Sequence, residues 1–155
     1  GGGSVAFRTL LEQQIAPAAE KGVKINPQQR ALWGHSYGGL FVLDSYLSSS
    51  FFSHYYAASP SIGQGFFSLL SQLQGLQTQQ VGTKQLTLME GNGDVRRDPN
   101  TAKPDVLRAV QSTVNRMAAN GVVARYQLYP GLSHGQMFGA SLEHTLSTMA
   151  QSGKP

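Results

Sequence analysis

The feature that most constrains the fold is a regular alternation of short apolar segments with longer amphipathic ones. The segments that suit buried strands are 30–34, 54–59, 84–90 and 122–129. The segments with helical spacing of apolar residues are 4–22, 40–47, 65–80, 106–120 and 136–150. Strands that alternate with helices form parallel sheets, because each connection returns the chain across one face of the sheet. The sequence therefore predicts an α/β fold, a mostly parallel sheet with helices on both faces.

The composition supports one domain and excludes several kinds of site. The chain has 155 residues, of which 40% are hydrophobic, and this is enough to build a single core. The absence of cysteine excludes a disulfide scaffold, a Cys₂His₂ zinc site, an iron–sulfur cluster and a thiol nucleophile. No apolar stretch approaches the roughly 20 residues that cross a bilayer. The basic residues are scattered, with Arg96-Arg97 as the longest run, so nucleic-acid binding is not expected.

A G-x-S-x-G motif occurs twice, at 34–38 and at 131–135, so its context must decide between the two serines. Ser36 follows a short apolar strand and directly precedes a helix, which is the strand–turn–helix setting of a nucleophile elbow. Ser133 follows a proline and has little sequence after it to supply a base and an acid. We therefore expect Ser36 to be the nucleophile. The N–H of Tyr37, at the start of the helix, is expected to contribute to an oxyanion hole.

A serine nucleophile needs a base close to it in space, and the chain has four histidines. In α/β-hydrolases the chain order is serine, acid, histidine. His134 lies in the loop after the last predicted strand, where this order places the base. His35 is expected to point away from Ser36 along its strand and to act in packing. His54 begins a strand and His144 lies within a helix. The sequence thus favours His134 as the general base.

The carboxylate partner of the histidine is less well defined by the sequence. Glu90 ends a predicted strand, and Asp94 and Asp98 lie in the loop that follows it, the segment that usually carries the acid. Asp94 is the first choice and Asp98 the second. Aspartate next to glycine or proline is also ordinary turn chemistry, so a Ser–His pair without a dedicated acid stays open.

Several segments resemble the bacterial siderophore esterases of the esterase-D-like group of α/β-hydrolases, which includes the periplasmic enterobactin and salmochelin esterases. The resemblance is strongest around the nucleophile, A-L-W-G-H-S-Y-G-G-L-F-V-L at 31–43. It extends to L-E-Q-Q-I-A-P at 11–17, Y-Y-A-A-S-P-S at 55–61 and G-L-S-H-G-Q-M-F at 131–138. It implies that Ser36 is the nucleophile and His134 the base. It also implies hydrolysis of the lactone bonds of enterobactin-type siderophores, with release of iron and without a metal or other cofactor.

The resemblance also suggests how substrate binds and where the protein works. Catecholate siderophores are anionic, and Arg96 and Arg97 lie in a loop that should border the site, so both are expected to contact the substrate. A periplasmic location follows from the resemblance. Two alternatives stay open, an esterase or acyltransferase acting on other acyl esters or thioesters, and a non-catalytic binding fragment of such a hydrolase.

The sequence departs from this family in one respect. Such proteins carry several strands before the helix with which this chain begins, and those strands hold the second oxyanion donor. We therefore expect residues 1–155 to be the C-terminal part of a single α/β-hydrolase domain, with the N-terminal part of the same protein as its partner. The strand before Ser36 is expected to have an unpaired apolar edge.

Overall fold

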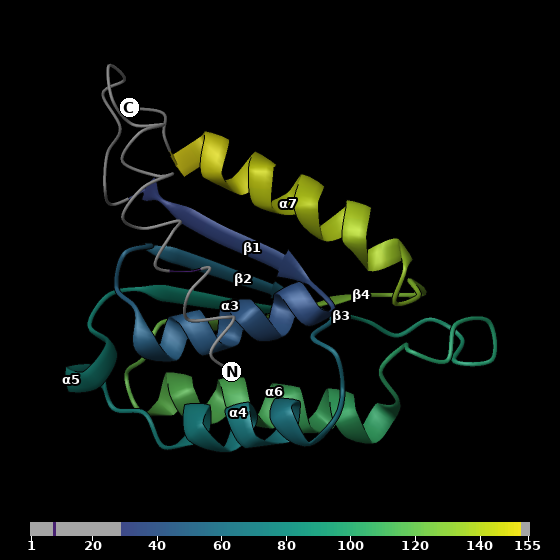
Figure 1. Ribbon diagram of the computed structural model, residues 1–155, viewed down its shortest axis with the longest axis horizontal. Helices are drawn as coiled ribbons and strands as arrows, with labels where there is room; N and C mark the ends of the chain where they lie inside the picture. Colours follow the sequence, from purple (N-terminus) through teal and green to yellow (C-terminus); the bar gives the residue numbers. More distant parts are fainter. Residues whose placement is uncertain (1–7, 9–28, 153–155) are drawn as a thin grey trace.

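The strands form one parallel sheet in which neighbours in sequence are neighbours in space (Figure 1). The computed structural model describes Arg8 and residues 29–152. The strands are β1 (Ala31–His35), β2 (His54–Ala58), β3 (Gln85–Gly91) and β4 (Ala124–Tyr129). The sheet has the order β1-β2-β3-β4, so β1 is an edge strand of the described sheet. Because all four strands are parallel, their carboxyl ends lie at one edge of the sheet, where the loops after β1, β3 and β4 begin.

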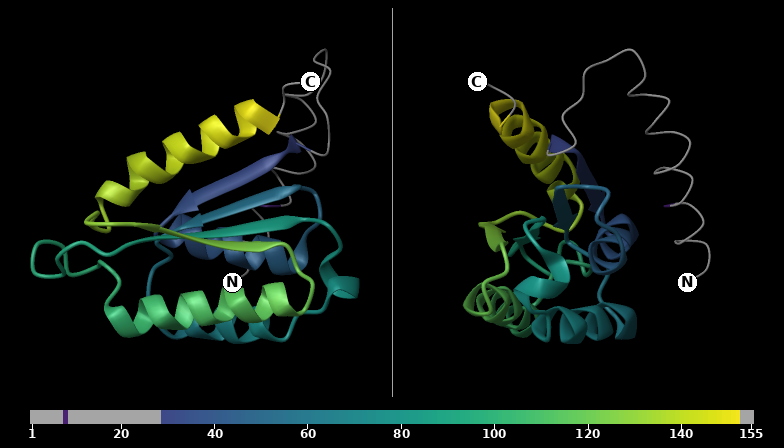
Figure 2. Two further views of the ribbon diagram at one scale, coloured as in Figure 1. Left: turned by 180° about the vertical axis from the view of Figure 1, so that it is seen from behind. Right: turned by 90° about the vertical axis from the view of Figure 1, so that its left-hand side faces the viewer.

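The helices cover both faces of the sheet, which confirms the predicted α/β fold. They are α3 (Tyr37–Ser48), α4 (Gln64–Gln74), α5 (Thr78–Val81), α6 (Pro104–Ala119) and α7 (Gln136–Ser152). Figures 1 and 2 show α7 on one face, and α3, α4 and α6 on the other. On that second face α3 contacts β1 and β2, while α6 contacts β3 and β4. Across the described part of the chain, no helix is long and apolar enough to cross a membrane.

The prediction differs from the structure at the helix expected at 65–80 and at the one expected at 106–120. The helix expected at 65–80 is divided: α4 ends at Gln74, and α5 begins after Gln77, whose backbone N–H is accepted by Gln80 in a capping box. Gly75 lies at the break, because glycine is a poor helix residue. The predicted helix at 106–120 begins earlier, at Pro104, because a proline at the first helical position needs no N–H partner. The helix expected at 4–22 lies outside the described residues, apart from Arg8.

The core alternates between the two faces along each strand. In β2, Tyr55 and Ala57 belong to the larger cluster under α3, α4 and α6. Tyr56 and Ala58 belong to a smaller cluster under α7, which includes Met137. The alternation follows from the two-residue period of a strand, and fully burying a large apolar side chain stabilises the fold by ~1.5–3 kcal/mol. Because both faces of β2 are packed, the strand is held in place, and so is the start of the loop that follows it.

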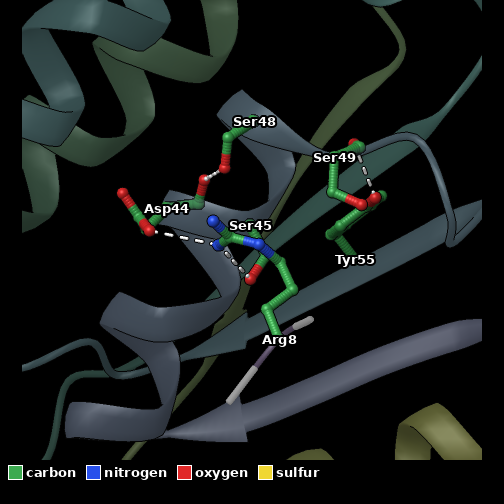
Figure 3. Close-up of polar contacts among 6 residues, drawn as sticks. All are labelled: Arg8, Asp44, Ser45, Ser48, Ser49 and Tyr55. Atoms are coloured by element: carbon green, nitrogen blue, oxygen red, sulfur yellow. Dashed lines mark hydrogen bonds and ion pairs between the residues drawn. The ribbon is translucent and has the colours of Figure 1, made fainter. Parts of the chain in front are cut away.

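A buried arginine contacts the outer surface of α3 (Figure 3). Arg8 donates hydrogen bonds to Asp44 Oδ2 at 3.1 Å and to Ser45 Oγ at 3.0 Å, and its guanidinium lies over the ring of Phe41. Only 6% of Arg8 is exposed. A guanidinium this buried requires a charged partner, and Asp44 supplies it. Asp44 is therefore engaged on the side of α3 and contributes to the structure of the helix.

Candidate active site

Ser36 lies at a sharp turn between β1 and α3. Its backbone has φ 62° and ψ −117°, a conformation that costs energy for any residue other than glycine. The turn is possible because Gly34 lies against the carbonyl of Gly38: a Cβ atom at Gly34 would clash with that carbonyl. The turn places Ser36 at the N-terminus of α3, where the N–H of Tyr37 has no acceptor within the helix. The predicted elbow is therefore present in the described structure.

Backbone hydrogen bonds to β2, to the loop after it and within α3 hold the elbow in place. The N–H of Ser36 donates to the carbonyl of Ala58 at 3.0 Å, at the end of β2. The carbonyl of Ser36 accepts the N–H of Ser61 at 3.1 Å and that of Leu40 at 3.2 Å. These bonds oppose relaxation of the strained backbone, because relaxation would break three backbone hydrogen bonds. The hydroxyl of Ser36 is thereby presented at the edge of the sheet.

The hydroxyl of Ser36 lies between a histidine and a second serine. Its Oγ is 3.1 Å from Nε2 of His134 and 2.9 Å from Oγ of Ser61. A neutral His134 with its proton on Nδ1 accepts the Ser36 proton at Nε2, which leaves the Ser36 oxygen free to accept from Ser61. The tertiary structure thus brings together Ser36 and His134, the pair that the sequence singled out, and adds a third group.

The surroundings of His134 favour its neutral form. Burial lowers the pKa of His134 below its ordinary value of 6.5, the nearby His35 lowers it further, and Asp98 opposes both. A base must be unprotonated to accept a proton, so a lowered pKa keeps His134 ready to act at neutral pH. The electrostatics of the site are therefore those that a general base requires.

The two aspartates of the loop after β3 have different partners. Asp94, the first choice for the acid, accepts hydrogen bonds from the Arg96 guanidinium, the closest at 2.8 Å, and this contact lowers the pKa of Asp94. Asp98 accepts the N–H of Gly135, next to His134, at 2.9 Å. Among the described contacts, the carboxylate associated with His134 is Asp98, and it touches the peptide backbone beside the ring. The structure therefore does not bring Asp94 to His134.

A cavity of about 440 Å³ opens in front of Ser36. It is lined by residues of the elbow, the loop after β2 and the loop before α6; these include Tyr37, Ser61, Ile62, Thr101, Lys103 and His134. Arg96 and Arg97, the predicted substrate contacts, are not among the described residues that line it. Arg96 is exposed and paired with Asp94, and Arg97 lines a different cavity beside Gly131. The cation placed at the cavity is Lys103, which the sequence reasoning missed.

Three other contacts were not predicted from the sequence. His35 does pack, against Phe138, but its Nε2 also donates to the carbonyl of His134 at 2.8 Å. Thr101 accepts the N–H of His134 at 2.9 Å. Ser61 could have been suspected, because it follows β2 closely and the carboxyl ends of parallel strands share one edge. No comparable signal marks Thr101.

The second G-x-S-x-G motif has a different role. The N–H of Ser133 donates to Oε1 of Gln136, and the N–H of Gln136 donates to Oγ of Ser133, at 2.9 and 3.2 Å. This reciprocal pair caps the start of α7. Within the described residues there is also no group of three histidine, aspartate or glutamate side chains that could hold a metal ion.

Known proteins that are similar to this chain are esterases. The family model named "Esterase" matches residues 1–149. Apo-salmochelin esterase of Escherichia coli O6:H1 is 48% identical over 145 residues, which cover 94% of this chain and 46% of that protein. The solved structure of "Enterobactin and Salmochelin Hydrolase IroE" has a TM-score of 0.82 at 45% identity, covering 98% of this chain and 57% of the other. The siderophore enterobactin esterase of Emericella nidulans is 39% identical over 74 residues, 46% of this chain and 24% of that protein.

These relatives are longer than the chain, which spans about half the length of the first two. The family match covers nearly all of this chain, and the fold, the elbow and the Ser36–His134 pair are those of an α/β-hydrolase. The chain therefore belongs to the Esterase family, within the α/β-hydrolases.

Proposed function

We propose that the protein containing this chain is a serine esterase that hydrolyses the ester (lactone) bonds of enterobactin-type catecholate siderophores and so releases their iron. The observation that carries the proposal is the 3.1 Å contact between Ser36 Oγ and His134 Nε2 at the mouth of a cavity. The names of the relatives, which are esterases of salmochelin and enterobactin, support the choice of substrate.

The reaction follows from the roles of the two side chains. Ser36 Oγ attacks the ester carbonyl carbon while its proton passes to Nε2 of His134. The tetrahedral intermediate collapses, the bond to the leaving oxygen breaks, and His134 returns the proton to that alkoxide, which leaves as an alcohol. Water then attacks the acyl-enzyme, with His134 again taking the proton, and releases the carboxylic acid and free Ser36.

Three groups near Ser36 and His134 assist this step. The N–H of Tyr37 lies at the start of α3 and has no acceptor within the helix, and the positive end of the helix dipole there favours an oxyanion. The Ser61 hydroxyl, 2.9 Å from Ser36 Oγ, donates to the nucleophile and so directs the Ser36 proton toward His134. The carboxylate of Asp98, near His134, stabilises the imidazolium that forms during the attack.

The cavity suits an anionic substrate. Lys103 contributes a positive charge to its wall, and Ile62 and Val106 contribute apolar surface. Catecholate rings combine an apolar face with negatively charged oxygens, so the two kinds of wall can contact the two parts of one substrate.

A fluorophosphonate probe tests the proposal, because it labels only an activated serine. The full-length gene product is expected to be labelled and to hydrolyse enterobactin faster than a short p-nitrophenyl ester. Ser36→Ala should abolish both labelling and turnover. Ser133→Ala is the matched control, since it removes the serine of the other motif, which caps α7. Labelling with a strong preference for the p-nitrophenyl ester would point to other acyl esters, and unlabelled, inactive protein would indicate a binding role.

A further inference from the structure

Side chains from distant parts of the chain bind the backbone N–H and carbonyl of His134 and the N–H of Gly135. Thr101 Oγ1 accepts the N–H of His134 at 2.9 Å, and His35 Nε2 donates to its carbonyl at 2.8 Å. Asp98 Oδ2 accepts the next N–H, that of Gly135, at 2.9 Å. The three side chains come from the end of β1 and from the loop between β3 and α6. The loop between β4 and α7 is therefore fixed at the residue that carries the base.

This arrangement differs from the usual way of orienting a catalytic histidine. In a serine triad a carboxylate accepts the Nδ1–H of the imidazole and so sets the ring directly. Among the described contacts of His134, the side-chain partner is Ser36, and the other hydrogen bonds are made by its backbone. With both peptide groups fixed, only the two side-chain torsions of His134 are left to place Nε2. The hydrogen bonds from Thr101, His35 and Asp98 form a clamp on the backbone at His134. This clamp limits the orientation of the ring, which in a triad is set by the partner of Nδ1.

Thr101 and His35 are held by their surroundings. Thr101 is 3% exposed, so its hydroxyl has little freedom to turn to water. The His35 ring packs against the ring of Phe138 at 5.5 Å and against that of His134 at 4.7 Å. Because His35 directly precedes Ser36, the same residue connects the nucleophile turn with the loop of the base.

We propose that Thr101, His35 and Asp98 are positioning residues that set the reactive nitrogen of His134 by holding its main chain. The inference rests on the proposed function, because it assigns to His134 the role of the base. It predicts that loss of a clamping hydrogen bond lowers kcat more than it raises KM, since these bonds place the base and are made within the protein.

Two of the clamp residues change the pKa of His134, and this provides a test that a purely structural role would not pass. His35 lowers the pKa of His134, and Asp98 raises it. Lys103, the residue just before α6, is the other charged group that lines the same cavity. Activity requires neutral His134, so it is lost as the pH falls through the pKa of His134. Removal of His35 should therefore move this acidic limb of the pH–activity profile to higher pH, and removal of the Asp98 charge should move it to lower pH.

The variants separate the hydrogen bond from the charge. Gln at position 35 keeps a donor and Asn at position 98 keeps an acceptor, so His35→Gln and Asp98→Asn should shift the limb in opposite directions. The plateau kcat should fall less in His35→Gln than in His35→Leu, because the hydrogen bond to the His134 carbonyl is kept, and Asp98→Asn should lower it by the loss of the charge alone. His35→Leu and Thr101→Val remove a hydrogen bond and should lower kcat about 10- to 100-fold, the size expected for a displaced catalytic group. Thr101→Val should leave the limb in place.

Matched controls remove the same groups elsewhere. Thr145→Val deletes a buried hydroxyl that donates to Ser141, and His144→Gln removes a histidine that packs on Tyr129. Both should leave kcat and the pH limb unchanged. The measurements use the full-length gene product: steady-state enterobactin hydrolysis against pH, and NMR titration of the His134 ring after histidine labelling.

The NMR titration keeps this inference distinct from the proposed function. Protein that neither turns over nor reacts with the probe would overturn the proposed function, and the opposite shifts of the His134 titration would still support the clamp. Active protein in which His35→Leu and Thr101→Val keep the wild-type kcat, or in which His35→Gln and Asp98→Asn leave the His134 titration where it is, would overturn the clamp.

Discussion

The Oγ atom of Ser36 lies 3.1 Å from Nε2 of His134, a residue 98 positions further along the chain. Their strands, β1 and β4, are at opposite edges of the described sheet, with β2 and β3 between them. At ~4.8 Å per strand, the two strand ends are ~14 Å apart. The loop after β4 therefore has to cross the end of β3.

The crossing depends on Gly93, which lies in the loop just after β3. The N–H of Gly93 donates to the carbonyl of Leu132 at 2.8 Å, and a Cβ atom on Gly93 would lie only 2.7 Å from the carbonyl carbon of Leu132. Asn92 adds a hydrogen bond from the N–H of Gly131 at 2.7 Å. The loop can thus lie directly on the backbone after β3 and carry His134 back to Ser36.

The elbow should be sensitive to a methyl group at one glycine and tolerant at another. Gly34→Ala is expected to destabilise the protein by about 2 kcal/mol or more, because the new Cβ would clash with the Gly38 carbonyl and force β1 away from α3. Gly38→Ala is the control, since a Cβ there meets nothing within 4 Å. Urea unfolding of both variants measures the difference, and equal stability would contradict the packing described for the elbow.

The hydroxyl of Ser61 should contribute modestly to the rate. Ser61→Ala is expected to lower kcat about fivefold, the effect of one neutral hydrogen bond of ~1 kcal/mol, because the Ser36 proton is no longer directed toward His134. Ser61→Thr, which keeps a hydroxyl, should retain most of the activity. Steady-state kinetics checks this, and a Ser61→Ala enzyme with the wild-type kcat would show that the contact has no role in the reaction.

Asp94 should be dispensable for the reaction. Its carboxylate pairs with Arg96 on the surface, so Asp94→Asn is expected to leave kcat and the pH profile within about twofold of the wild type, as an exposed ion pair is worth little. A loss of activity comparable to that of Ser36→Ala would restore Asp94 as the acid. The measurement is the pH dependence of enterobactin hydrolysis.

Lys103 should affect substrate binding more than catalysis. Lys103→Gln is expected to raise KM for an anionic catecholate ester about three- to tenfold and to leave KM for a neutral ester unchanged, because only the anion is attracted by the charge at the cavity. Arg96→Gln is the comparison, since that guanidinium is engaged by Asp94 away from the cavity. The opposite ranking of the two variants would return the substrate contact to Arg96.

A buried carboxyl at the end of β3 should make stability depend on pH. Glu90 is 1% exposed, its Oε2 has no hydrogen-bond partner among the described residues, and burial raises its pKa from 4.5 to about 8. Between these two pH values the folded state keeps a proton that the unfolded state loses. The free energy of unfolding should therefore decrease as the pH rises from about 4.5 to about 8. The slope from one such group is at most ~1.4 kcal/mol per pH unit.

Glu90→Gln tests this directly. The amide cannot ionise, so urea unfolding of the variant should lose that part of the pH dependence and be more stable relative to the wild type at pH 8 than at pH 5. Thr87→Val, an isosteric change that removes a polar group at another buried position of β3, is the control and should keep the wild-type pH dependence. An unchanged slope in Glu90→Gln would mean that Glu90 is ionised in the folded protein.

The sequence by itself determined the order of the elements, the position of the elbow and the identity of the Ser36–His134 pair. These depend on local information: the period of apolar residues, the glycines next to Ser36, and a histidine after the last strand. Only the tertiary structure decided the partners of that pair. Asp98 rather than Asp94 lies at the His134 loop, Lys103 rather than Arg96 lines the cavity, and His35 and Thr101 hold the backbone of His134. The physical reason is that His35 and Thr101 are 99 and 33 residues away from His134 in the sequence. Their contacts with His134 depend on how the loops fold over the edge of the sheet, and no local sequence pattern encodes such contacts.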